Sequence, residues 1–97
     1  MSLMERKKHP FTIEGVIQTP NEEGVYLIVS RNLDPIYIGR GNLRKRLTSH
    51  YHQEDLVDRC IWSNNPAHFY QEICSNSEER EKELLKSIPT ACNGKIS

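Results

Sequence analysis

Two tyrosines, an arginine and a late glutamate are of the types that can act together on a phosphodiester. Tyr26 ends the triplet Gly24–Tyr26, Tyr37 opens the triplet Tyr37–Gly39, and both precede the arginine-rich segment Arg40–Arg46. Hydrolysis of a phosphodiester needs an activated water, stabilised charge on the phosphoryl oxygens and relief of charge on the leaving oxygen. Tyrosine hydroxyls, a guanidinium and a distant carboxylate can supply these functions if the fold brings them together.

The two tyrosines fall on two predicted strands. Residues 25–29 are β-branched and aromatic, which is typical of a strand, and residues 36–38 form a second one. Ser30 to Asp34 has the composition of a turn, so the sequence predicts a β-hairpin. Opposed residues of an antiparallel pair point to the same face. A turn with an even number of residues therefore places Tyr26 and Tyr37 on one face, whereas an odd turn or a bulge would not.

A helix is predicted over residues 42–51, with Asn42 as its N-cap. Leu43 and Leu47 form the apolar stripe of this helix at i, i+4 spacing. Arg46 and His50 lie beside that stripe. We therefore expect these two polar side chains to border the sheet rather than to point fully into solvent.

Three further elements are predicted in the C-terminal half. They are a helix over 54–62 with Leu56, Val57, Cys60 and Ile61 buried, a strand over 68–73, and a helix from Ser75 to about Ile88. A capping-box pattern, Ser75 to Glu78, opens the last helix, and Pro89 ends it.

Glu81 lies on the apolar stripe of this last helix. The stripe consists of Leu84, Leu85 and Ile88, and helical spacing continues it back to Glu81. A carboxylate on a core-facing stripe is costly unless it is paired or binds a cation. Glu81 is therefore a candidate functional residue, and the neighbouring Glu79 takes its place if the helix phase is different.

These elements predict a small α+β fold, a three-stranded antiparallel sheet with flanking helices. At 97 residues the chain has room for one core. Residues 1–20 are expected to form an irregular N-terminal arm, with a short extended piece at 11–13, and residues 21–97 to form the domain. Met1–Leu3 precede a second methionine, Met4, and are expected to be a cloning remnant.

Charge and cysteine content limit the function classes. Lysine plus arginine and aspartate plus glutamate are balanced at 13 each, yet residues 35–53 contain no acid and four basic residues. Such a local basic face suits contact with phosphates, although a solvated helix face would look the same.

Three widely spaced cysteines without a C-x-x-C pair predict reduced thiols and a cytoplasmic location. The longest apolar run is too short to cross a membrane, so no membrane association is expected.

The ordered motifs resemble the GIY-YIG nuclease family, over roughly residues 24–93. The resemblance rests on Gly24–Tyr26, on Tyr37–Gly39, on the helix Asn42-Leu-x-x-Arg-Leu-x-x-His50, and on a late glutamate and asparagine. Such domains occur in excision-repair nuclease subunits, which suggests a role in DNA repair, and in homing endonucleases. The segment between Tyr37 and Arg46 is shorter here than in the excision-repair type.

The resemblance implies hydrolysis of DNA by a one-metal mechanism that leaves a 5′ phosphate. Glu81 would hold Mg²⁺ or Mn²⁺, which are hard cations suited to a carboxylate. Arg46 would bind the phosphate, Tyr37 would orient water or phosphate, and Tyr26 would take the proton of the water with help from His50. Because tyrosine has a pKa of about 10, Arg46 and the metal would have to favour its phenolate. Further DNA contacts are expected from Arg40, Arg44, Lys45 and Asn93.

Other functions remain open at this stage. A non-catalytic nucleic-acid-binding module on the same fold is the main alternative, and a protein-interaction domain is a weaker one. Glu81 could also be a simple salt-bridge partner of Lys45 or Arg80, and Asn93 a cap at the chain end. If the protein is a nuclease, its small size suggests a homodimer or an additional DNA-binding partner protein.

Overall fold

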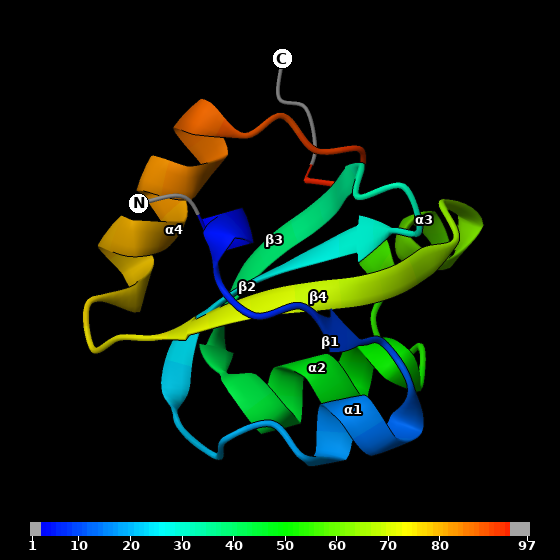
Figure 1. Ribbon diagram of the computed structural model, residues 1–97, viewed down its shortest axis with the longest axis horizontal. Coiled ribbons are helices and arrows are strands. Elements are labelled where there is room, and N and C mark those ends of the chain that lie inside the picture. The colour runs from blue at the N-terminus through cyan, green and yellow to red at the C-terminus, as the bar shows by residue number, and fades with distance from the viewer. Residues whose placement is uncertain (1–2, 94–97) are drawn as a thin grey trace.

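An antiparallel sheet of four strands with helices on both faces makes up the fold (Figure 1). The structure is a computed structural model that describes residues 3–93. Along the chain the elements are η1 (Leu3–Glu5), β1 (His9–Pro10), α1 (Ile13–Ile17), β2 (Glu23–Ser30), β3 (Pro35–Asn42), α2 (Leu43–Tyr51), α3 (Val57–Ser63), β4 (Pro66–Ile73) and α4 (Ser77–Ser87). The strands lie in the order β1-β4-β2-β3, with every neighbouring pair antiparallel. The predicted α+β class is confirmed.

The prediction of three strands is wrong, because β1 adds a fourth. His9 pairs with Phe69 and Pro10 pairs with His68, both on β4. A strand of two residues is too short to show the alternation of apolar and polar residues by which a strand is recognised in a sequence. Proline is tolerated here because β1 lies at the edge of the sheet, where a missing N–H leaves no ladder bond unmade.

The β2–β3 hairpin places both tyrosines on one face, as predicted. Tyr26 lies opposite Gly39, and Ile28 lies opposite Tyr37. The register shifts between Ile28 and Val29, which lies on the turn side of these pairs, so the shift does not separate the two tyrosines. Both strands are longer than predicted, because β2 is central and its residues from Gly24 to Val29 are all buried.

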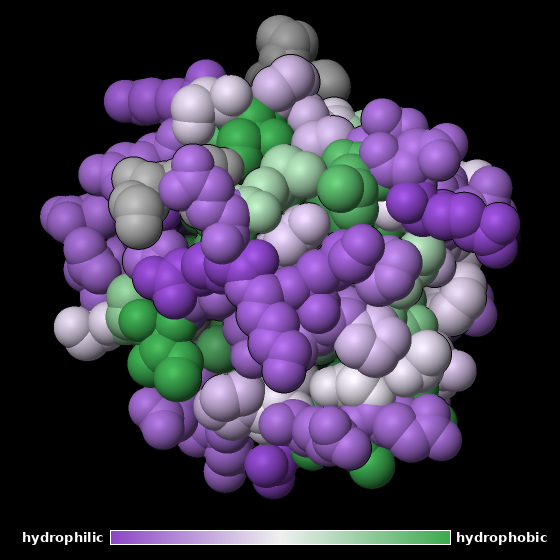
Figure 2. Space-filling view, in the orientation of Figure 1, coloured by the Kyte–Doolittle hydropathy of each residue, from purple (hydrophilic) through white to green (hydrophobic). Residues whose placement is uncertain are grey.

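The sheet separates two hydrophobic cores. Helices α1, α2 and α3 cover one face, whereas η1 and α4 cover the other (Figure 1). The first core contains Phe11, Val16, Tyr26, Ile28, Ile36, Leu43, Leu47, Ile61, Phe69 and Cys92. The second contains Leu3, Val25, Leu27, Val29, Ile38, Tyr70 and Leu84. Hydrophilic side chains dominate the outside of the face seen in Figure 2, where apolar side chains show only as separate patches.

Helix α2 begins as predicted, whereas α4 does not. The Asn42 side chain accepts a hydrogen bond from the Lys45 backbone N–H at 3.0 Å, which caps α2. The capping box predicted for α4 is wrong, because α4 begins at Ser77 and its N-cap, Asn76, makes no side-chain cap bond. The Ser77 hydroxyl instead donates to the carboxylate of Glu23 on β2. This tertiary bond takes precedence over the local pattern.

Helix α3 begins later than predicted, which changes the residues that it buries. Leu56, predicted to be buried, is 89% exposed, whereas Ile61 is fully buried as expected. Asp58 is only 1% exposed and faces inward on the same side as Ile61. Two hydrogen bonds, from the His50 ring and from the Asp55 backbone N–H, satisfy the Asp58 carboxylate in this buried position.

The N-terminal segment is not the irregular arm that the sequence predicts. Thr12 caps α1 by accepting a hydrogen bond from the Gly15 backbone N–H at 3.1 Å. Phe11 and Val16 are buried in the first core, and Leu3 is fully buried in the second. Of the expected cloning remnant, Met1 and Ser2 lie outside the described residues. The described part of this segment therefore closes both cores.

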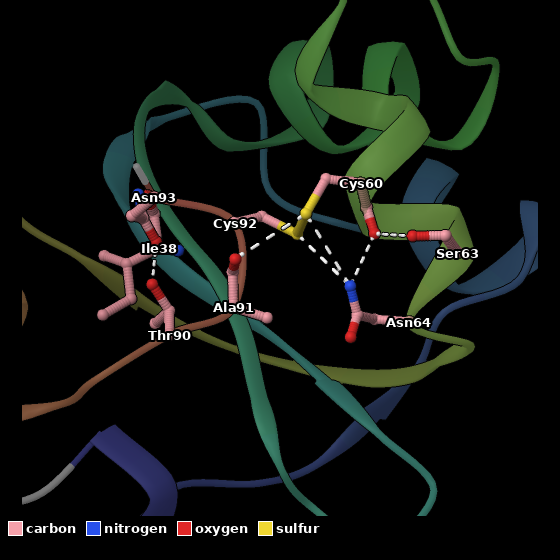
Figure 3. Close-up of a disulfide and its surroundings, with 8 residues drawn as sticks. All are labelled: Ile38, Cys60, Ser63, Asn64, Thr90, Ala91, Cys92 and Asn93. Carbon is pink, nitrogen blue, oxygen red and sulfur yellow. Dashed lines mark hydrogen bonds between the residues drawn. A yellow bond between two sulfur atoms is a disulfide. The ribbon is translucent and has the colours of Figure 1, made fainter. Parts of the chain in front are cut away.

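A disulfide joins Cys60 on α3 to Cys92 near the end of the described chain (Figure 3). The prediction of reduced thiols is wrong for this pair, whose Cα atoms lie 5.8 Å apart. Cys74 is a free thiol. The two bonded cysteines are 32 residues apart, so spacing alone did not reveal the pair.

The cytoplasmic location stays a prediction. Among residues 3–93, no helix has the length and apolar character needed to cross a membrane.

Candidate active site

Tyr26 lies under β3, in the space that Gly39 leaves. A Cβ atom at position 39 would overlap the Tyr26 hydroxyl, so glycine is required for this close approach. Tyr26 is 0% exposed. Its hydroxyl forms a hydrogen bond of 2.7 Å with Nε2 of His50, which is also fully buried. The two glycine-tyrosine triplets of the sequence are thus one packing unit.

Three rings meet on this face of the hairpin. The ring centroids of Tyr26 and Tyr37 are 6.3 Å apart, those of Tyr26 and His50 are 5.6 Å apart, and those of Tyr37 and His50 are 5.2 Å apart. Tyr26 is buried, whereas Tyr37 is only partly buried. The sequence correctly places the three residues together, and the structure adds that Tyr37 is the phenol nearer to solvent.

Arg46 reaches the phenols from α2. Its guanidinium interacts with the Tyr26 hydroxyl, and its Nη2 pairs with Oδ2 of Asp55 at 3.3 Å. Its side chain remains 36% exposed. Gly41, at a φ of 128°, lets the stem of Arg46 pass, since a Cβ there would lie 3.1 Å from Arg46 Cγ. Burial opposes the charge of Arg46, but Tyr26, Asp55 and Tyr37 together outweigh burial and raise the pKa of this guanidinium.

Glu81 lies on α4, in the opposite layer, and its charge influences the same phenols. Its side chain is 24% exposed, whereas Glu79 is exposed. Leu84 of the predicted stripe is buried, but Leu85 is 38% exposed, so the prediction that Leu85 belongs to the core-facing stripe is wrong.

The Glu81 carboxylate lies 3.5 Å from the Arg40 guanidinium. Arg40 is thus its ion-pair partner in place of Lys45 or Arg80, which the sequence suggested. Burial raises the pKa of Glu81, and Arg40 works against this rise.

The electrostatics connect these groups into one site. Burial is the largest cause that raises the pKa of Tyr26 and of Tyr37. The Glu81 carboxylate adds to the rise for both phenols, whereas Arg46 lowers the pKa of both. Burial also lowers the pKa of His50. The charge of an acid on α4 and the charge of a guanidinium on α2 therefore both influence the same pair of phenols.

Comparison with known proteins identifies the fold. No family model matches the sequence, and no curated protein matches it. A solved structure does match, the GIY-YIG N-terminal endonuclease domain of UvrC from Thermotoga maritima, an asparagine-to-alanine point mutant bound to its catalytic divalent cation. The match has a TM-score of 0.71 at 23% identity and covers 84% of this chain and 93% of the other. The chain has the GIY-YIG fold.

Two sets of residues in this GIY-YIG fold could hold a divalent cation. Glu81 offers a part-exposed carboxylate, which fits an ion that keeps most of its waters. His50, Asp55 and Asp58 offer ligand atoms that all lie within 4.8 Å of one another. However, His50 Nδ1 and Asp58 Oδ1 are 2.6 Å apart, which is a hydrogen bond and leaves no space for an ion between them. The chemistry of the donors therefore favours Glu81.

The basic residues of the sequence lie around Arg46. Arg44 and Lys45 are exposed on α2 and, together with Arg46, Thr48 and Ser49, line a cleft of about 440 Å³. The Nε of Arg44 donates to the backbone carbonyl of Thr19 at 2.9 Å, which fixes its stem. Arg40 is exposed on β3. This basic surface borders the site on the α2 side, as the acid-free segment suggested.

Asn93 lies against β3, beside Ile38 and Thr90 (Figure 3). Its amide accepts a hydrogen bond from the Ile38 N–H at 2.7 Å and donates to the Ile38 carbonyl at 2.8 Å. The Thr90 hydroxyl donates to the same amide oxygen. The Asn93 side chain thereby makes the two hydrogen bonds that a neighbouring strand would make to the Ile38 backbone. Its contact with DNA stays a prediction.

The sequence did not indicate the two aspartates of the site. Asp58 accepts a hydrogen bond from Nδ1 of His50 and is as deeply buried as the histidine. Asp55 pairs with Arg46 from the loop before α3. The signal for Asp58 was the one that identified Glu81, an acid three residues from a buried apolar residue, here Ile61. It was missed because the predicted start of the helix was too early.

Proposed function

We propose that this protein is a metal-dependent endonuclease that hydrolyses phosphodiester bonds of DNA. One observation carries the proposal: a carboxylate from α4 and a guanidinium from α2 act on the same two phenols of the β2–β3 hairpin. The fold supports it, since the UvrC domain is an endonuclease domain that binds a catalytic divalent cation.

Arg46 is the group that we assign to the phosphate. Its planar paired donors match a phosphate, and its side chain is open enough to reach one. Tyr26 and Asp55 hold the guanidinium, so little side-chain freedom is lost when a phosphate binds.

The two phenols have different parts in this proposal. Tyr26 is fully buried and bonded to His50, so we assign it to the support of Arg46. Tyr37 is partly buried, and we assign it the contact with the attacking water. Because burial raises the pKa of Tyr37 and Arg46 opposes that rise only in part, the protonated hydroxyl would orient the water by a hydrogen bond.

Glu81 would hold the Mg²⁺ or Mn²⁺ ion. When bound, the ion supplies positive charge that stabilises the leaving 3′ oxygen. The ion pair with Arg40 favours the ionised carboxylate and opposes the rise in pKa that partial burial causes. Arg40, Arg44 and Lys45 would hold the flanking phosphates of the strand, and Asn93 would serve mainly to keep β3 in place beside them.

Nicking of a supercoiled plasmid in Mg²⁺ tests this function. We expect the wild-type protein to produce open circles, and Arg46→Ala and Glu81→Ala to abolish nicking while the circular dichroism spectrum is kept. Arg59→Ala and Glu79→Ala are the matched controls, since both side chains are exposed. Robust nicking by Arg46→Ala or Glu81→Ala would refute the role given to that residue.

A non-catalytic nucleic-acid-binding module is the second candidate. The raised pKa of both phenols favours it, because neither is an efficient base at neutral pH. Gel-shift titration with a labelled duplex at low salt separates the two candidates. Binding without nicking, unchanged by Glu81→Ala, would support the module and contradict the nuclease.

A further inference from the structure

Asp58 is the most deeply buried carboxylate of the site, and both of its oxygens are used. Its side chain is 1% exposed, and a buried carboxylate is tolerated only when hydrogen bonds satisfy it. Oδ1 accepts from His50 Nδ1 at 2.6 Å, and Oδ2 accepts from the backbone N–H of Asp55 at 2.9 Å. These two bonds lead to Arg46 by separate routes.

The first route runs through His50 and Tyr26. Because Nδ1 carries the proton that His50 donates to Asp58, the Nε2 of a neutral imidazole has a free lone pair. Burial lowers the pKa of His50, which keeps the ring neutral. Nε2 therefore accepts a hydrogen bond from the Tyr26 hydroxyl, with 2.7 Å between the nitrogen and the oxygen. The phenol oxygen keeps its lone pairs for the guanidinium of Arg46.

The second route runs through the loop before α3. The bond from Asp58 to the Asp55 N–H fixes the backbone of that loop. The carboxylate of Asp55 then pairs with Nη2 of Arg46 at 3.3 Å. Since this pair is partly exposed, with side-chain exposures of 36% and 40%, its geometry depends on the loop being held.

We propose that Asp58 is a positioning residue that fixes the Arg46 guanidinium through both routes, by way of His50–Tyr26 and by way of Asp55. The proposal rests on the nuclease function given above, because it is the phosphate-binding group that Asp58 orients. A long, half-exposed arginine has many conformations, and two converging contacts restrict it to one before a phosphate arrives. A single carboxylate in the interior thus controls a group at the surface.

The variant Asp58→Asn tests this role with almost no change of volume. An asparagine offers one acceptor oxygen and one donor NH₂ group, so it either loses the bond from the Asp55 N–H or donates to Nδ1 of His50, which requires the other imidazole tautomer. The first readout is the order parameter of the Arg46 Nε–H group by ¹⁵N relaxation. We expect a value close to that of rigid backbone, about 0.85, in the wild type and a fall below about 0.6 in the variant.

The second readout is the tautomer of His50, from the ¹⁵N shifts of its imidazole. We expect protonated Nδ1 and unprotonated Nε2 in the wild type, and a mixture in Asp58→Asn. An aspartate that only supports His50 would change the His50 signal but leave the Arg46 order parameter unchanged. Asp34→Asn, in the exposed turn between β2 and β3, is the control and should change neither readout.

The variant Asp55→Ala keeps the test open if Asp58→Asn does not fold. It removes only the second route, from a part-exposed site, and should lower the Arg46 order parameter without altering the His50 tautomer. Nicking should fall about tenfold to a hundredfold in both variants. An Arg46 order parameter that stays high in every folded variant, or a wild-type His50 protonated at Nε2, would overturn the positioning role. An ordered Arg46 in a wild type that does not nick would contradict the nuclease and leave the positioning role standing.

Discussion

Because Tyr26 is fully buried and Tyr37 only partly, we expect removal of the Tyr26 hydroxyl to cost more stability than removal of the Tyr37 hydroxyl. Tyr26→Phe deletes a hydroxyl that donates to His50 Nε2 at 2.7 Å, with both residues 0% exposed. The change leaves a buried acceptor without its donor, which costs about 1–3 kcal/mol of unfolding free energy. In a domain of this size, each kcal/mol lowers Tm by about 4–8 °C. We therefore expect Tm to fall by roughly 4–24 °C in thermal denaturation followed by circular dichroism.

Tyr37→Phe is the matched comparison on the neighbouring strand. Because Tyr37 is only partly buried, its change should alter the unfolding free energy by less than about 0.5 kcal/mol. Nicking should nevertheless be lost, since the hydroxyl of Tyr37 is the one assigned to water. Equal losses of Tm in the two variants would refute the reasoning from burial. A Tyr37→Phe variant that nicks at the wild-type rate would refute the assignment to water.

Three further perturbations follow from the packing around the site. Gly39→Ala places a Cβ on the Tyr26 hydroxyl and should cost about 1–3 kcal/mol in urea denaturation. Replacing both Cys60 and Cys92 by serine opens a loop between residues 32 apart and should cost about 3–4 kcal/mol. Because burial lowers the pKa of His50 below 6.5, the unfolded chain takes up its proton first as pH falls. Stability is then full above pH 6.5 and falls below it, and His50→Gln should flatten this slope.

A specific result would contradict each of these three predictions. A Gly39→Ala variant as stable as the wild type would show that the Tyr26 ring can move away. Loss of both disulfide cysteines without change in Tm would mean that the bridge does not form, and Cys74→Ser serves as the control. An unfolding free energy with the same pH slope in wild type and His50→Gln would show that His50 is not the group that titrates.

Strong local signals made the hairpin and α2 predictable from the sequence. The β-branched run on β2 and the Asn42 cap each act within a few residues, and the sheet register then fixes the side on which both tyrosines lie. Glu81 was also predictable, because a carboxylate on an apolar stripe breaks the expected pattern. In each of these cases the decisive residues are close together in the sequence or recur with the period of a helix or a strand.

The features that the sequence did not reveal depend on contacts between distant residues. β1 forms only because β4 offers an edge, and α4 begins where Ser77 meets Glu23. The disulfide likewise depends on two chain segments that the fold alone brings together. Asp58 was missed for a related reason, since its burial follows from a helix start that tertiary contacts with His50 and Asp55 determine.

The position of a bound divalent ion tests the central assignment most directly. Crystals soaked in Mn²⁺ would give an anomalous difference peak at the ion, and the two candidate sets lie on different helices. We expect the peak at the carboxylate of Glu81, with no peak in crystals of Glu81→Gln. A peak between His50, Asp55 and Asp58 in the wild type, undiminished in Glu81→Gln, would contradict the proposed active site.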